Sequence, residues 1–165
     1  MSAFWAYFWP AFAAGIVTGL LGGLIVFRGA RMNRIALGAG AAVAIGLAGL
    51  WHGPIGGADR FSAIVEKDLR GALRYYEMTR IDAHLHRAPL TRRINLSGQA
   101  DDFQRSELAR LLGQIPGVSS ATWSNKGGVP LIAEGAIAAV LGYLFGLLLA
   151  YLVALHRRYN AQWNW

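Results

Sequence analysis

The sequence predicts an α-helical membrane protein with three transmembrane helices and a small α+β extramembrane domain. Three long apolar stretches, residues 9–27, 35–51 and 131–155, enclose one polar block, residues 52–130. Each stretch reaches or approaches the ~20 residues that a helix needs to cross a hydrocarbon layer about 30 Å thick. Only Glu134 places a charge inside one of them, so three crossings are expected.

The arginines outside the polar block predict the orientation of these helices. Short loops that are rich in Lys and Arg stay on the cytoplasmic side of a membrane. Arg28, Arg31 and Arg34 lie between the first two stretches, and Arg157 and Arg158 follow the third. Both clusters predict that the N-terminus and the polar block are outside and that the C-terminus is cytoplasmic.

This layout divides the chain into three parts. Residues 1–52 hold an aromatic N-terminal segment, expected to lie at the membrane interface, and the first two helices. Residues 53–129 form the outer domain, and residues 130–165 form the third helix and a cytoplasmic tail.

Composition argues against several function classes. The formal charge of +7 comes mostly from the two cytoplasmic arginine clusters, because the polar block itself has eleven Lys or Arg against eight Asp or Glu. Such dispersed charge does not favour nucleic-acid binding. The chain has no cysteine, which excludes disulfides and thiolate metal sites. No hydrolase motif, phosphate loop or set of mid-membrane polar residues is evident, so we expect no enzyme, cofactor or small-molecule substrate.

Small residues recur every four positions in all three apolar stretches. Such rows let helix backbones approach closely, and packing rather than the hydrophobic effect holds helices together in a membrane. A three-helix bundle needs only some of these rows internally, so a spare row could receive a helix of another subunit or of another copy. The alternative is that membrane helices are simply rich in Gly and Ala. The rows are Gly15, Gly19 and Gly23; Gly38, Ala42 and Gly46; and Ala138, Gly142, Gly146 and Ala150.

The polar block predicts a domain with the order helix, strand, strand, helix, strand (αββαβ). Apolar residues keep helical spacing over residues 61–76, and they alternate with polar residues over 81–85 and 94–98, which indicates two strands. Residues 101–115 begin with a capping-box pattern and continue as an amphipathic helix. Residues 118–124 form a third strand, so two helices would cover one face of a three-stranded sheet.

Part of this block resembles the BON domain. The strand INLSG at residues 94–98, a helix of about fifteen residues and the sequence IPGV at 115–118 match the second half of that family's pattern. The resemblance covers roughly residues 60–125, and the first half matches in element order. It implies a periplasmic, non-enzymatic module that binds phospholipid surfaces or protein partners, and it favours the bacterial inner membrane.

Two sets of residues are candidates for chemistry. Asp82, His84 and His86 share one strand face at a period of two, and a His-x-His pair with a carboxylate can bind zinc. An exposed polar strand face explains the same pattern. His52 and Glu134 close the second and open the third stretch on the same side, so they could pair. Glu134 equally suits the N-terminal turn of a helix that Pro130 starts.

These observations predict an accessory subunit. Its helices would pack onto a larger inner-membrane complex of respiratory or photosynthetic type, and the outer domain would brace that complex. In the alternative, the outer domain binds phospholipid or envelope components on its own, and the helices only anchor it. The expected partners are membrane lipids and other integral membrane subunits.

Overall fold

The structure is a computed structural model that describes residues 2–27, 34–124 and 127–161. Its contacts divide the chain into two compact units. The helical unit comprises Phe8–Ile55 and Gly135–Trp165, and the domain unit comprises Met1–Tyr7 and Gly56–Glu134. The contact-based division thus places the first seven residues with the polar block, whereas the sequence groups them with the apolar stretches.

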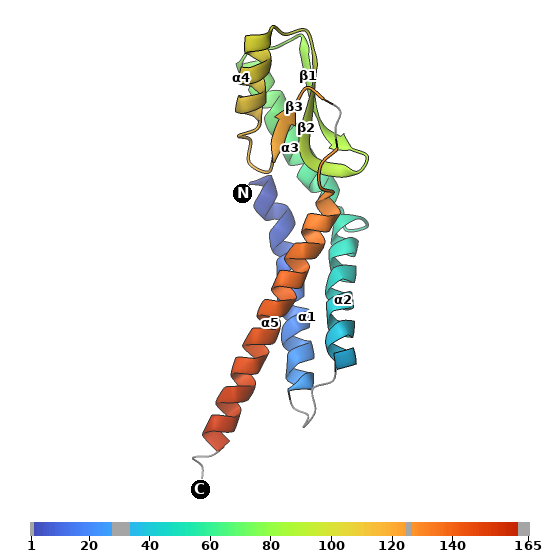
Figure 1. The fold of residues 1–165 in the computed structure, drawn as a ribbon, viewed down its shortest axis with the longest axis vertical. Helices are drawn as coiled ribbons and strands as arrows, with labels where there is room; N and C mark the ends of the chain where they lie inside the picture. The colour runs from blue at the N-terminus through green and yellow to red at the C-terminus, as the bar shows by residue number, and fades with distance from the viewer. Residues whose placement is uncertain (1, 28–33, 125–126, 162–165) are drawn as a thin grey trace. The chain divides into compact units, whose positions relative to one another are not determined.

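Three long apolar helices are present, as the sequence predicts: α1 (Ala3–Val26), α2 (Arg34–His52) and α5 (Leu131–Ala161) (Figure 1). All three are long and apolar enough to cross a membrane. Helix α1 begins six residues before the predicted apolar stretch, because the aromatic N-terminal segment is itself helical. The interfacial segment expected there is therefore the first two turns of α1.

The helices α1 and α5 run in the same direction. Gly15 on α1 lies against Ala139 on α5, and Gly23 lies against Ala150, so residue numbers rise together along the two helices. This parallel arrangement places the C-terminal ends of α1 and α5 at the same end of the helical unit. The chain between them therefore starts and finishes at opposite ends of this unit.

The domain unit contains two helices and a small three-stranded sheet. The strand order is β1-β2-β3, with β1 antiparallel and β3 parallel to β2. Helix α3 packs against β1, and helix α4 packs against β3. The elements are α3 (Gly57–Tyr75), β1 (Ile81–Arg87), β2 (Leu90–Gly98), α4 (Asp102–Leu112) and β3 (Ser120–Thr122).

Alternating burial fixes the register of the sheet. On β1, Leu85 is fully buried while His84 is exposed, and Leu85 pairs directly with the buried Ile94 of β2. A slip of one residue would turn these apolar side chains toward water. The helices complete the core with Phe61, Val65, Leu69, Leu108 and Leu112.

Local signals determine where α4 begins and how the chain leaves it. Asp101 accepts a hydrogen bond from the Gln104 backbone N–H, and the Gln104 side chain accepts one from the Asp101 N–H, which completes the predicted capping box. After the helix, Gly117 has a φ of 107°, a conformation that favours glycine. The side chains of Ala3 and Phe61 lie close to the place that a Cβ would occupy there.

Candidate functional site

The small-residue rows of α1 and α5 pack against each other. A Cβ on Gly15 would overlap the carbonyl oxygen of Ala139, and one on Gly142 would overlap the carbonyl oxygen of Phe12. The same holds for Gly19 beside Tyr143 and for Gly146 beside Ile16, while a Cβ on Gly23 would overlap the Ala150 side chain. These backbones touch, so only glycine fits without separating the helices. Ala138 is half-buried, and its neighbour Ala139 takes the buried position in this contact.

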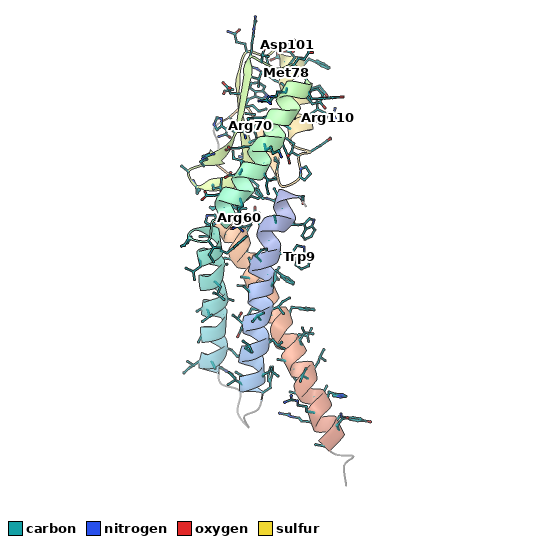
Figure 2. The ribbon with its side chains drawn as sticks, turned by 180° about the vertical axis from the view of Figure 1, so that it is seen from behind. Trp9, Arg60, Arg70, Met78, Asp101 and Arg110 are labelled. Atoms are coloured by element: carbon teal, nitrogen blue, oxygen red, sulfur yellow. The ribbon has the colours of Figure 1, made fainter. Side chains whose placement is uncertain are left out.

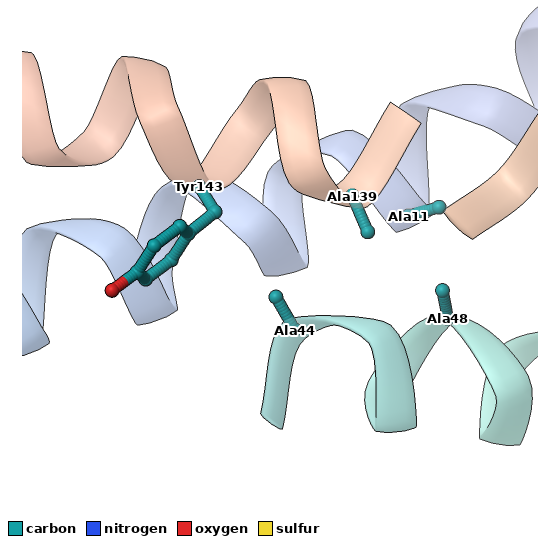
Figure 3. Close-up of a cluster of buried hydrophobic side chains, with 5 residues drawn as sticks. All are labelled: Ala11, Ala44, Ala48, Ala139 and Tyr143. Atoms are coloured by element: carbon teal, nitrogen blue, oxygen red, sulfur yellow. The ribbon is translucent and has the colours of Figure 1, made fainter. Parts of the chain in front are cut away.

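Helix α2 contacts α5 through a different set of residues. Ala44 and Ala48 are buried with Ala139 and Tyr143 in one cluster, together with Ala11 (Figure 3). The Tyr143 hydroxyl donates a hydrogen bond of 2.8 Å to the carbonyl oxygen of Leu37. Since Leu37 precedes Ala44 in α2 whereas Tyr143 follows Ala139 in α5, α2 runs antiparallel to the other two helices.

The predicted row on α2 lies on the opposite side of that helix. A Cβ on Gly38 or Gly46 would meet no atom within 4 Å, and Ala42 between them is exposed. At 3.6 residues per turn, these three positions share one face, nearly opposite Ala44 and Ala48. We call Gly38, Ala42 and Gly46 the outer row. Within the described residues, the outer row has no packing partner.

A polar cluster joins the start of α5 to the domain sheet. Arg92 Nε on β2 lies 3.0 Å from Glu134 Oε2, and the two side chains are only 19% and 24% exposed. The Arg92 guanidinium also lies 5.1 Å from the centre of the Phe4 ring, a cation–π distance. Glu134 donates its backbone N–H to the carbonyl oxygen of Pro130 in the first turn of α5. An ion pair with a strand was not anticipated for this carboxylate.

The first turns of α1 complete the core of the domain unit. Tyr7 is 1% exposed, its ring contacts that of Phe61 edge-on, and its hydroxyl lies 3.4 Å from the carbonyl oxygen of Leu131. Ala3 is equally buried. In contrast, Trp9 is half exposed and points outward from α1 (Figure 2). The N-terminal aromatic cluster therefore contains one ring that belongs to a protein core.

The candidate metal ligands remain on the outer face of β1. Asp82 and His84 are exposed, and His86 Nδ1 lies 3.0 Å from the carbonyl oxygen of Pro89. Among the residues that the structure describes, no three His, Asp or Glu side chains are grouped to hold a metal ion. The zinc site and the polar strand face both stay predictions for these residues.

His52 and Glu134 fall in different units. His52 is the last residue of α2 in the helical unit, and Glu134 belongs to the domain unit. Each has interactions within its surroundings. Their pairing stays a prediction.

The sequence reasoning missed which face of α2 packs against the other helices. The buried alanines of α2, Ala44 and Ala48, form a second small row on the other side of the helix, and the sequence alone does not say which row faces inward. Tyr143 could have identified the inward face of α5. Its hydroxyl lies in the middle of an apolar stretch, so it needs a hydrogen-bond acceptor on a neighbouring helix.

Comparison with protein-family models, with curated proteins and with solved structures finds no match to this chain.

Proposed function

We propose that this protein is a three-pass subunit of the bacterial inner membrane, with its N-terminus and its domain in the periplasm. The helix directions support this topology, because the end of α1, the start of α2 and the end of α5 lie at the same end of the helical unit. Arg34 begins α2, while Arg157 and Arg158 lie in the last turns of α5. The basic residues thus gather at one end of the helical unit, as cytoplasmic arginines do.

We further propose that the outer row of α2 receives a helix of a larger membrane complex. The observation that carries this proposal is the contrast between rows: those of α1 and α5 fill each other, whereas Gly38 and Gly46 meet nothing. A groove of small residues lets a second helix approach until backbones touch, which gains dispersion contacts and weak Cα–H hydrogen bonds. Two larger side chains, Val43 and Ile45, are exposed on the same helix and would flank such a partner.

The domain would brace the complex from the periplasmic side. Its resemblance to the BON domain supports a non-enzymatic module that contacts protein or lipid. The proposed partner complex is an inner-membrane assembly of respiratory or photosynthetic type, which offers both membrane helices and periplasmic surfaces.

A pair of matched substitutions tests the docking proposal. Gly46→Ile fills the outer row, and Gly22→Ile adds the same side chain to α1 at a position that is equally open. The tagged full-length chain would be expressed at native level, crosslinked in the membrane and purified in mild detergent. We expect the wild type and Gly22→Ile to retain a membrane-protein partner and Gly46→Ile to lose it. Recovery of only a free monomer from the wild type would contradict the proposal.

A second candidate function is binding of the domain to another envelope surface. Near the end of α3, Arg70, Arg74 and Met78 line a surface hollow, and the adjacent Tyr75 is 82% exposed. Figure 2 labels Arg70 and Met78. Arginines beside an exposed aromatic ring suit an anionic, partly apolar surface such as a phospholipid layer.

Vesicle tethering with the full chain tests this second function. The protein would be inserted in neutral vesicles, and association with a second population of anionic vesicles would be measured by light scattering at low salt. Arg70→Gln with Arg74→Gln should abolish tethering, whereas Arg60→Gln, in the first turn of α3, should not. Equal scattering with neutral and anionic targets would exclude this function.

A further inference from the structure

A pocket lies between the ends of α1 and α5 within the helical unit. Its volume is about 170 Å³, and its walls combine four apolar residues with two arginines. The lining residues are Leu24, Phe27, Val153, Ala154, Arg157 and Arg158. One side of the pocket is further ordered by an edge-on contact between the rings of Phe27 and Tyr151.

Among the described residues, the two arginines of the pocket have no anionic partner. Neither Arg157 nor Arg158 forms an ion pair or a side-chain hydrogen bond with any residue that the structure describes. The sequence of the helical unit, residues 8–55 and 135–165, contains no Asp or Glu. A side-chain anion that neutralises these guanidinium groups must therefore come from outside this unit.

The depth of the arginines matches a lipid headgroup. At 1.5 Å per residue, Arg157 lies about 39 Å along α5 from Leu131. A hydrocarbon layer is about 30 Å thick, and a bilayer with its headgroup regions is about 40–45 Å. The apolar lining residues are about one turn closer to the membrane centre, where acyl chains lie.

We propose that this pocket binds an anionic phospholipid. The phosphate contacts the guanidinium groups of Arg157 and Arg158, and the beginning of an acyl chain lies against Leu24, Phe27 and Ala154. Basic pockets between transmembrane helices on the cytoplasmic side have this chemistry, and guanidinium binds phosphate with two hydrogen bonds. The site is separate from the outer row and from the domain, and it rests on the membrane insertion proposed above.

Native mass spectrometry of the delipidated full chain tests the site. Phosphatidylglycerol and phosphatidylcholine of the same acyl composition would be titrated into the detergent-solubilised protein. We expect phosphatidylglycerol to bind roughly thirtyfold more tightly, given about 1 kcal/mol for each of the two arginines near an anionic lipid. Arg157→Gln with Arg158→Gln should remove that preference, whereas Arg34→Gln, at the same end but outside the pocket, should keep it.

A third variant tests the cavity independently of the two arginine charges. Ala154→Leu fills the cavity and leaves both arginines, so it should also lose most of the preference for phosphatidylglycerol. An unchanged preference for phosphatidylglycerol in this variant would contradict the proposal that the lipid binds in the pocket. Displacement of the lipid by millimolar inorganic phosphate would show that the site binds anions in general instead. Each variant must keep the wild-type thermal unfolding midpoint in detergent.

A carbonate wash of membranes distinguishes failure of this inference from failure of the topology. If carbonate releases the chain, the proposed membrane insertion is wrong. If the chain stays in the membrane but shows no preference for phosphatidylglycerol, only the lipid site is wrong.

Discussion

Arg92 of β2 and Glu134 of α5 form a largely buried ion pair, with 3.0 Å between Arg92 Nε and Glu134 Oε2. Removing one partner of such a pair leaves a poorly solvated charge, which costs about 1–3 kcal/mol. We therefore expect Glu134→Gln or Arg92→Met to destabilise the domain unit by that amount. Hydrogen exchange of the β2 amides in the full-length chain, followed by mass spectrometry, would report the loss.

The ion pair between Arg87 and Glu66 is the matched control. Its distance is shorter, 2.6 Å, and the Glu66 side chain is only 19% exposed, but the Arg87 side chain, whose charge Glu66→Gln would leave unpaired, is 66% exposed. Exposed pairs contribute about 0.2–1 kcal/mol, so Glu66→Gln should change the exchange rates little. A larger effect for Glu66→Gln than for Glu134→Gln would contradict the role of burial.

Tyr7 is expected to stabilise the domain unit although it lies in α1. Its ring is buried against Phe61, and truncating a buried aromatic side chain costs roughly 3 kcal/mol. Tyr7→Ala should therefore lower the free energy of unfolding of the domain unit, measured by hydrogen exchange of α3. Trp9→Ala removes a larger ring that is half exposed and should leave α3 protected.

Gly142 and Gly22 provide a matched pair in the helical unit. An alanine Cβ at position 142 would collide with the backbone of Phe12, whereas one at position 22 would meet nothing within 4 Å. Gly142→Ala should lower the thermal unfolding midpoint in detergent, because the two helix backbones must separate. Gly22→Ala should leave it unchanged or raise it slightly through helix propensity. Equal effects would show that α1 and α5 do not pack through this row.

The capping box of α4 predicts that replacing Asp101 lowers the stability of the domain more than replacing the adjacent Asp102. Asp101 accepts the backbone N–H of Gln104 at 2.7 Å, so Asp101→Ala should destabilise the domain by about 1 kcal/mol. Asp102 lies in the first turn of α4 and does not make this capping bond. Asp102→Ala should therefore destabilise the domain less, because it removes only the favourable interaction of the carboxylate with the helix dipole. Chemical denaturation of both variants of the full chain would compare them.

Periodicity located the long elements well because it reports burial directly. Three long apolar helices and a small sheet are present, and the capping box at Asp101 lies where the sequence places it. The start of α1 was less predictable, since an aromatic segment suits both a membrane interface and a protein core. Tyr7 is buried because it contacts Phe61 and Leu131, which lie far along the chain. No local sequence pattern describes such contacts.

The local sequence pattern also could not predict which row of small residues on α2 faces the other helices. Gly38, Ala42 and Gly46 repeat as regularly as Gly15, Gly19 and Gly23, yet only the second set is packed. The decision on α2 depends on the tertiary contact of Ala44 and Ala48 with α5. Spacing identifies a face of small residues, and only the contact partner tells whether that face is filled.

The burial of Tyr7 also limits when the domain unit can finish folding during synthesis. The Tyr7 ring leaves the ribosome 124 residues ahead of Leu131, whose carbonyl oxygen its hydroxyl contacts. Folding of the domain unit therefore cannot finish until residue 131 has been made. Until then the Tyr7 hydroxyl lacks its contact with Leu131. A nascent chain that is stalled before residue 131 should accordingly remain sensitive to protease in its N-terminal segment.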